Sequence, residues 1–189
     1  MERLLTVDQI AEQLNQYFCS DLEDDELDLS DLVLDPQVHD IDANLRALER
    51  NLNLVLPETF KQLNRAYDLS QFTLGNISFG FGGHYLQSIQ ASNQDEQFSP
   101  WWQGDARPQS LILIAAGDPF AVIMDCESHN IYALDSSGQY ECIATDFDLF
   151  FRGMGSVVLG HVSSLEACLV VGFDQERVFW NEVRPYPKR

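Results

Sequence analysis

The residues of this sequence whose types are typical of a structural zinc site are its cysteines and histidines. Cys126 and His129 are separated by two residues, and Cys142 with His161 could complete a set of four zinc ligands. Structural zinc sites usually contain two closely spaced pairs, whereas Cys142 and His161 are far apart in the sequence. We therefore interpret Cys126 as a strand-end thiol and His129 as a turn residue, and we expect no metal site.

Covalent or cofactor chemistry is the second possibility for these residues. A cysteine nucleophile could pair with His129 or His84, because catalytic groups assemble in space rather than in sequence. No local signature marks any cysteine as a nucleophile. The stretch 80–83, Gly-Phe-Gly-Gly, lacks both the Lys-Ser/Thr of a phosphate-binding loop and the spacing of a dinucleotide-binding fingerprint. We expect no catalytic residue and no cofactor, and keep a hydrolase as the less favoured alternative.

Two hydrophobic periodicities divide the chain into the elements that would position any site. Helical spacing predicts three helices in the first part of the chain, over residues 7–19, 41–52 and 57–67. Asp40 is expected to cap the second of them, and Pro57 to open the third. Three more helices are predicted later, one starting at residue 146, one over 164–171 and one near 174–180. Glycine-punctuated strands begin at Gln71, a short helix starts near Tyr85, and a loop spans 93–107. Antiparallel strands are predicted over 111–115, 120–124, 130–134 and 139–144. This order indicates an α+β fold with a central, mostly antiparallel sheet flanked by helices.

The composition excludes several classes of protein. Among 189 residues, 30 are Asp or Glu and 11 are Lys or Arg, which gives a net charge of −19. A nucleic-acid binder needs clustered cations, and the cations here are scattered. No apolar run approaches the roughly 20 residues of a membrane span. Because acids occupy the start of the chain, where a signal peptide needs basic residues, we expect a soluble cytoplasmic protein with reduced cysteines.

Two segments stand out as candidate interaction sites. Residues 20–42 contain ten acidic residues and no Lys or Arg, interleaved with leucines. Such a segment either docks one side on the fold while presenting carboxylates outward, or is mobile. Trp101 and Trp102 are adjacent in a polar loop. They either anchor a partner, as aromatic hot spots do, or cover the edge of the core.

Two stretches together resemble the SUKH superfamily, which is named partly for the yeast Smi/Knr cell-wall regulator and is populated largely by bacterial immunity proteins. The first is Leu-Pro-Glu-Thr-Phe-Lys-Gln-Leu at 56–63, a Leu-Pro helix opening with an aromatic residue three positions after the proline. The second runs from Gly117-Asp118 through the paired strands to the Phe-containing helix start at 143–150. The resemblance covers residues 45–155. It implies an α+β fold without catalytic residues that often binds and neutralises a toxin, frequently a nuclease or deaminase.

These observations lead us to expect a single SUKH-like domain over residues 1–189. Its core would span about 45–155, with an N-terminal helix and acidic segment over 1–44 and a helical C-terminal extension over 163–189. The expected function is neutralisation of a basic bacterial toxin domain by protein binding, with no nucleic-acid or membrane partner. The alternative is an acidic cytosolic adaptor or regulatory protein, whose charge reflects solubility or a saline habitat. The predicted partner-binding residues are Asp24, Asp25, Glu26, Asp28 and Asp31 for steering, and Trp101 and Trp102 for anchoring.

Overall fold

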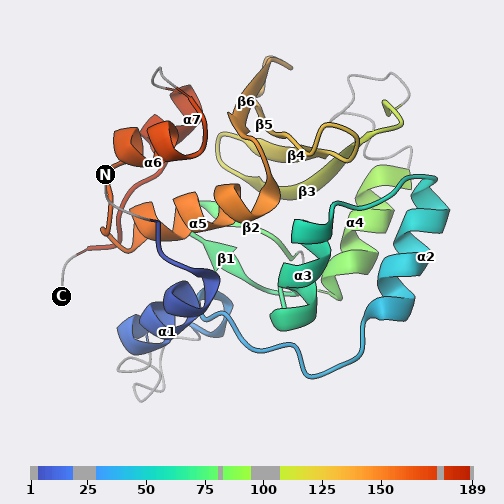
Figure 1. Ribbon diagram of the computed structural model, residues 1–189, viewed down its shortest axis with the longest axis horizontal. Helices are drawn as coiled ribbons and strands as arrows, with labels where there is room; N and C mark the ends of the chain where they lie inside the picture. Colours follow the sequence, from blue (N-terminus) through green and yellow to red (C-terminus); the bar gives the residue numbers. More distant parts are fainter. Residues whose placement is uncertain (1–3, 19–28, 81–82, 95–106, 174–176, 188–189) are drawn as a thin grey trace.

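The computed structural model describes residues 4–18, 29–80, 83–94, 107–173 and 177–187 (Figure 1). Within these ranges the chain forms a six-stranded antiparallel sheet whose spatial order follows the chain order. Its strands are β1 (Thr73–Leu74), β2 (Ile77–Ser78), β3 (Leu111–Gly117), β4 (Ala121–Asp125), β5 (Ile131–Leu134) and β6 (Tyr140–Ala144). The helices are α1 (Val7–Phe18), the 3-10 turn η1 (Ser30–Leu32), α2 (Asp42–Leu52), α3 (Glu58–Ala66), α4 (Tyr85–Gln94), α5 (Phe147–Val158), α6 (Ser164–Val170) and α7 (Val178–Glu182).

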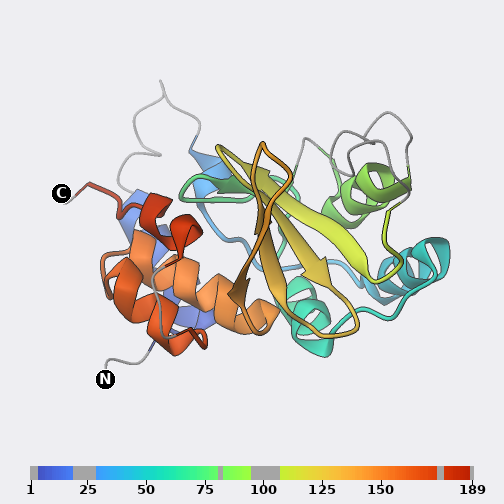
Figure 2. The same cartoon turned by 90° about the horizontal axis from the view of Figure 1, so that it is seen from above.

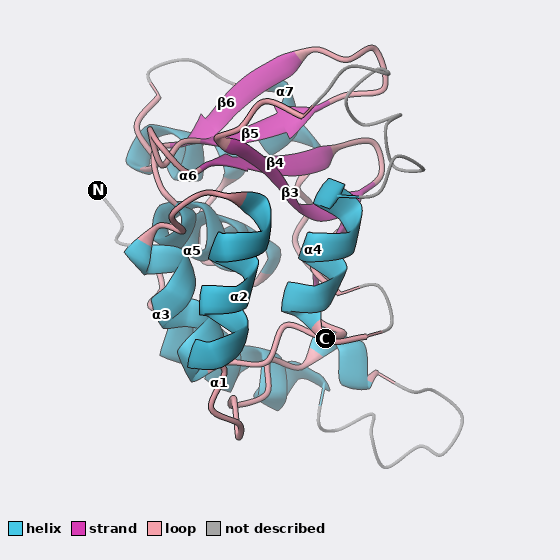
Figure 3. Cartoon of the chain, turned by 90° about the vertical axis from the view of Figure 1, so that its right-hand side faces the viewer, coloured by secondary structure: helices cyan, strands magenta, loops and turns pink. Residues whose placement is uncertain are grey.

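The predicted α+β class and antiparallel sheet are confirmed. Helices α2–α5 form a layer beneath strands β3–β6 (Figure 3). Seen from above, α1 and α5–α7 gather at one end of the sheet, and α2 and α4 lie at the other (Figure 2). Helices from both ends of the chain therefore gather at one end of the sheet, and helices from its middle lie at the other.

Helix α5 is the centre of the aromatic core. Asp146 caps the helix, because its Oδ1 accepts a hydrogen bond of 2.8 Å from the backbone N–H of Leu149. The Phe147 ring lies 5.0 Å from the ring of Phe60 in α3, and the Phe151 ring lies 5.7 Å from that of Phe79. These fully buried rings join the helical layer to the start of the sheet.

Helix α4 protects the edge of β3 where the short strand β2 ends. The Asn93 side chain accepts a hydrogen bond from the Leu113 N–H and donates one to the Leu113 carbonyl, both at 2.9 Å. The Tyr85 hydroxyl donates to the carbonyl of Ile114 at 2.8 Å. The predicted helix start near Tyr85 is confirmed, whereas the loop expected from residue 93 was placed too early. The helix continues through Gln94, so Asn93 takes the place of a neighbouring strand.

The described N-terminal residues pack directly on α5. Thr6 and Gln9 form a capping box at the start of α1, the helix predicted over 7–19, with reciprocal bonds of 2.9 and 3.2 Å. An added Cβ at Gly155 in α5 would lie 2.4 Å from Ile10 Cδ1, so glycine is what permits the close approach of the two helices. The apolar face of α1 therefore enters the same core as the sheet.

The C-terminal residues close the other side of α5. The predicted helix near 174–180 begins at Val178, because the N–H groups of Val178 and Phe179 donate to the two carboxylate oxygens of Glu141 in β6. The indole Nε1 of Trp180 donates to the carbonyl of Ile143 at 3.0 Å. Residues of α6, α7 and the following Val183 belong to the main hydrophobic core.

Candidate partner-binding surface

One of the seven predicted partner-binding residues lies in the described part of the chain. Asp31 is exposed in η1. The residues Asp24, Asp25, Glu26, Asp28, Trp101 and Trp102 lie outside the described residues. The surface around Asp31 is therefore the part of the candidate site that can be built from contacts.

The described part of the acidic segment, residues 29–40, docks on the fold. Leu34 is buried in the core with 3% exposure, and Pro36 forms an isolated bridge with Tyr67. The Asp68 N–H donates to the Asp35 carbonyl at 2.8 Å. The interleaved leucines thus hold the backbone while the Asp31 and Asp35 side chains face solvent. For these residues, the docked alternative is the correct one.

This segment runs alongside α1 in the opposite direction. At one end, burial raises the pKa of Tyr186 and the nearby charge of Asp31 adds to that increase. The Tyr186 ring lies 5.5 Å from that of Tyr17 near the end of α1. At the other end, the bridge to Pro36 involves Tyr67, whose hydroxyl donates at 2.6 Å to Asp8 Oδ1 near the start of α1. Figure 1 shows the segment starting beside α1 and continuing to α2.

Tyr67 corrects one sequence-based expectation. Helix α3 ends at Ala66, and Tyr67 is extended rather than the last residue of the helix predicted over 57–67. Its half-buried side chain reaches α1 instead. Burial raises the pKa of Tyr67 to about 12, and the hydrogen bond and negative charge of Asp8 add to that increase. The phenol therefore remains a neutral donor that fixes α1 against the docked segment.

Together these elements form a surface that we call the N-terminal acidic face. From Leu4 to Ile41 the sequence has eleven acidic residues and no Lys or Arg. No Lys or Arg of the described residues forms an ion pair with a carboxylate of this face. Its exposed carboxylates belong to Asp8, Glu12, Asp31, Asp35 and Asp40.

Ion pairs concentrate instead between α2 and α3. Arg65 contacts Asp42 Oδ1 at 2.8 Å and Glu58 Oε1 at 2.9 Å, and Lys61 Nζ lies 3.4 Å from both Glu49 and Glu58. The hydrogen bonds from Arg65 lower the pKa values of Asp42 and Glu58 below their ordinary values. These two cations are thus paired with acids of α2 and α3 and not with carboxylates of the N-terminal acidic face.

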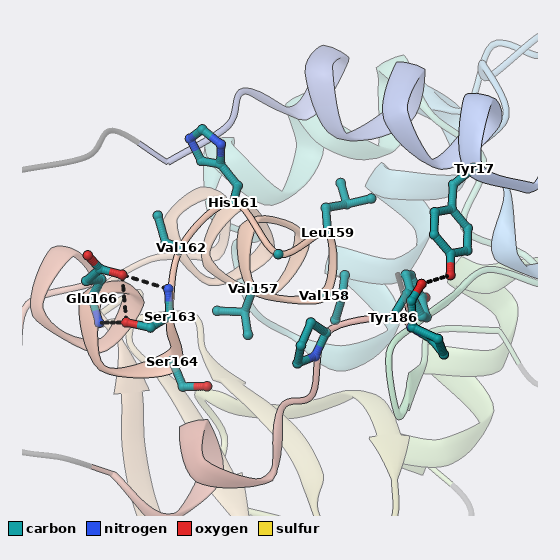
Figure 4. A pocket seen from close by; sticks show the side chains of 13 residues that line it. Tyr17, Val157, Val158, Leu159, His161, Val162, Ser163, Ser164, Glu166 and Tyr186 are labelled. Atoms are coloured by element: carbon teal, nitrogen blue, oxygen red, sulfur yellow. Dashed lines mark hydrogen bonds between the residues drawn. The ribbon is translucent and has the colours of Figure 1, made fainter. Parts of the chain in front are cut away.

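A pocket of about 890 Å³ lies beside this face, between α1, the α5–α6 turn and the C-terminal residues (Figure 4). Ser163 and Glu166 line it, and they form the capping box of α6. The Ser163 hydroxyl donates to Glu166 Oε2 at 2.6 Å and accepts from the Glu166 N–H. These bonds give the serine and the carboxylate a structural role in starting the helix.

The cysteine environments bear on the metal and nucleophile possibilities. Cys126 and His129 lie in the turn after β4, where His129 has a φ of 66°, and Cys142 is in β6. Among the residues that the structure describes, no group of three or more His, Cys, Asp or Glu side chains could hold a metal ion. Burial raises the pKa of Cys126 to about 12, with a further increase from the charge of Asp125.

Cys126 should therefore react slowly with alkylating reagents in the folded protein. A rise in pKa from 9.0 to about 12 lowers the thiolate fraction at neutral pH by about a thousandfold, and the thiolate is the nucleophile. Peptide-level mass spectrometry after brief iodoacetamide treatment measures this rate, and the same treatment in urea gives the unprotected reference. Rapid labelling of Cys126 in the folded chain would restore the hydrolase alternative.

Residues 42–153 match the model of the SMI1 / KNR4 family (SUKH-1), a range that runs from α2 into α5. A search of curated proteins finds no significant match. None of the helices within the described ranges has the length and apolar character needed to cross a bilayer.

Proposed function

The chain belongs to the SMI1 / KNR4 family (SUKH-1), and from this premise we propose that it is a non-enzymatic immunity protein that captures a basic bacterial toxin domain. Domains of this family are known as immunity-type protein modules. The observation that carries the proposal is the N-terminal acidic face. Its described carboxylates, those of Asp8, Glu12, Asp31, Asp35 and Asp40, are exposed and form no ion pair with a described Lys or Arg.

The charge of this face is suited to a partner that handles nucleic acid. A nuclease or deaminase needs a positive cleft for its substrate, and a protein with a net charge of −19 is attracted to that cleft by the same field. Complementary charge raises the association rate and its dependence on salt more than it raises affinity. Such a toxin acts in the cytoplasm, so we also propose a cytoplasmic location for its inhibitor.

We assign two roles in binding: acidic residues attract the partner at long range, and aromatic residues anchor it in the complex. Asp31 is the described member of the steering set, which continues through Asp24, Asp25, Glu26 and Asp28. Trp101 and Trp102 are the proposed anchors, because large aromatic side chains supply most of the binding energy in many interfaces. The four further exposed acids of the N-terminal acidic face, Asp8, Glu12, Asp35 and Asp40, extend the steering surface.

Neutralising the five predicted steering acids should slow capture of the basic partner. The variant carries Asp24→Asn, Asp25→Asn, Glu26→Gln, Asp28→Asn and Asp31→Asn. We expect its association rate at low ionic strength to fall about tenfold, and the salt dependence of that rate to flatten, because long-range attraction is lost. Stopped-flow kinetics over a range of salt concentrations measures both quantities.

A matched pair of variants separates the effect of the acidic face on the association rate from the effect of total charge. Glu12→Gln, Asp31→Asn and Asp35→Asn remove three charges from the face. Asp118→Asn, Glu127→Gln and Glu182→Gln remove three exposed charges elsewhere. The first triple variant should associate more slowly than the second. Equal rates for the two triples, or an unchanged rate for the five-acid variant at low salt, would favour the adaptor alternative.

A further inference from the structure

The pocket beside α1 is built by residues outside the family match. Its walls come from the end of α1, from the turn between α5 and α6, and from residues that follow α7 (Figure 4). The lining residues are Tyr17, 157–164, Glu166 and 185–187. None of them lies within residues 42–153, the range of the match. Membership of the family therefore does not predict what this pocket binds.

Hydrogen bonds hold two tyrosines in the wall of the pocket. The Tyr186 N–H donates to the Val158 carbonyl at 2.7 Å, and its hydroxyl accepts from the Gly75 N–H at 3.0 Å. The Tyr17 hydroxyl donates to the Pro187 carbonyl. The two rings face each other with their centroids 5.5 Å apart (Figure 4). Because this wall is fixed before a ligand arrives, binding loses little free energy to ordering it.

The polar side chains of the wall already have partners within the chain. Both tyrosine hydroxyls are used in the bonds above, and the Ser164 hydroxyl donates to the Val183 carbonyl at 3.3 Å. Ser163 and Glu166 bond each other in the capping box, and His161 also has a partner. The remaining lining residues are glycine, valine, leucine and proline. The pocket therefore favours an apolar side chain, since a polar group would lose its bonds to water without gaining a partner.

Negative charge lies next to this apolar wall. Glu166 is an exposed carboxylate of the pocket. Asp31 of the N-terminal acidic face is close to Tyr186, because its charge adds to the increase in the pKa of Tyr186 that burial mainly causes. The lining residues include no Lys or Arg, and the neighbouring Arg184 guanidinium donates to the Asn181 carbonyl. An apolar side chain flanked by cations is therefore complementary to the pocket and its surroundings.

We propose that this pocket receives one apolar side chain, such as leucine, from a basic segment of the partner. This inference rests on the proposed function and names the feature of the partner that the same surface recognises. The N-terminal acidic face attracts the segment, and burial of its apolar side chain then slows its release. Such a division is common, because side chains seated in pockets supply much of the binding energy of an interface.

Two peptides of equal charge test the pocket on the native chain. Each is a fluorescein-labelled nonapeptide with four lysines on either side of a central residue, which is leucine in one peptide and serine in the other. At about 0.02 M salt, where screening is weak, the leucine peptide should bind about tenfold more tightly. That gain is typical of partly burying one leucine side chain. Fluorescence anisotropy measures both dissociation constants, and equal constants would overturn the inference.

Photo-cross-linking locates the bound side chain. The central leucine of the peptide is replaced by photo-leucine, and the links formed on the native chain are identified by mass spectrometry. Links should fall on Tyr17, on residues 157–166 and on residues 185–187, which surround the pocket. An excess of the unlabelled leucine peptide should suppress them. Links confined to other parts of the chain would place the leucine elsewhere and overturn the inference.

A matched pair of leucine variants tests the wall itself. Leu159 lines the pocket and is half-buried against the main core. Leu54 is also half-buried against that core but lies between α2 and α3, away from the lining residues. Leu159→Gln should reduce the preference for the leucine peptide at least threefold, and Leu54→Gln should retain it. Equal preferences in the two variants would contradict the inference. The two experiments on the native chain decide the question even if a variant does not fold.

The five-acid variant distinguishes failure of this inference from failure of the proposed function. If it binds both peptides as tightly as the native chain does, the acidic face does not capture cations. The proposed function then fails, and the inference that rests on it fails too. If it binds both weakly but the native chain does not prefer leucine, the inference alone fails. A native chain that dimerises without peptide, and no longer does so as Leu159→Gln, would place a second copy in the pocket and also overturn the inference.

Discussion

Replacing Trp180 by alanine is expected to lower the free energy of unfolding by about 3–5 kcal/mol, the usual range for removing a large buried aromatic side chain. Trp180 is fully buried, and its indole Nε1 donates to the Ile143 carbonyl at 3.0 Å. Its ring fills space next to Gly153 in α5, where an added Cβ would lie 2.7 Å from Trp180 Cη2. Urea unfolding followed by circular dichroism measures the change.

This variant also tests whether the C-terminal extension belongs to a single domain. Trp180 lies outside the family match, which ends at residue 153, so a large cooperative loss would show that α7 is part of the folding unit. Trp180→Phe should cost less, because it keeps most of the apolar volume and loses the indole hydrogen bond. Val178→Ala, at a residue with 62% exposure on the same helix, should change stability little. A Trp180→Ala effect as small as that of Val178→Ala would contradict the account.

Replacing Asn93 by leucine is expected to cost about 2–4 kcal/mol, because the N–H and carbonyl of Leu113 would each lose a buried hydrogen-bond partner. Leucine has nearly the shape of asparagine, so the loss isolates the polar contacts. Those contacts are the two bonds of 2.9 Å by which Asn93 completes the edge of β3. The change is measured by the same urea unfolding experiment.

Gln87→Leu is the matched control for Asn93→Leu. It makes the same kind of exchange at an exposed position of α4, where a change within about 0.5 kcal/mol is typical. If Asn93→Leu were as mild as this control, the side chain would not be serving as a substitute strand. Hydrogen exchange at the Leu113 amide gives a second readout, since loss of its acceptor should speed the exchange.

Much of the fold could be predicted because its signals are local. The Thr6/Gln9 capping box starts α1 where the sequence places it, and the four apolar runs become β3–β6 close to their predicted bounds. Asp40 was predicted to cap the second helix. The helix begins at Asp42 with Ile41 at the capping position, so this prediction was one residue early, although Asp40 Oδ1 accepts from the Asp42 N–H at 3.0 Å. Caps, turns and periodicity depend on neighbours in the sequence, so a single chain reveals them.

The features that could not be predicted depend on partners that are distant in sequence. In the sequence, Asn93 is an ordinary residue of an amphipathic helix. Its role depends on Leu113 of β3, which is 20 residues further along the chain. Glu141 starts α7 from 37 residues away. Tyr67 follows the helical pattern of α3, but its hydroxyl is taken by Asp8, 59 residues earlier. No spacing rule connects such pairs.

The candidate surface was predicted in part. The acidic composition of residues 20–42 identified the segment, and its leucines left docked and mobile as open alternatives. The burial of Leu34 decides for docking in the described residues. Asp8 and Glu12 were missed as members of the surface. Their signal was present, because both stand on the polar side of the helix whose buried face contains Ile10 and Leu14.

Recovery of the tagged protein from native lysate, at low and at high salt, tests the central claim most directly. The cells must express the neighbouring genes, and the co-purifying proteins are identified by mass spectrometry. The account predicts a stoichiometric basic partner at low salt that is weakened at high salt and reduced with the five-acid variant, because screening or removing the acidic field slows capture. Recovery of the protein alone at both salt concentrations, or equal recovery of the partner by the five-acid variant, would contradict it.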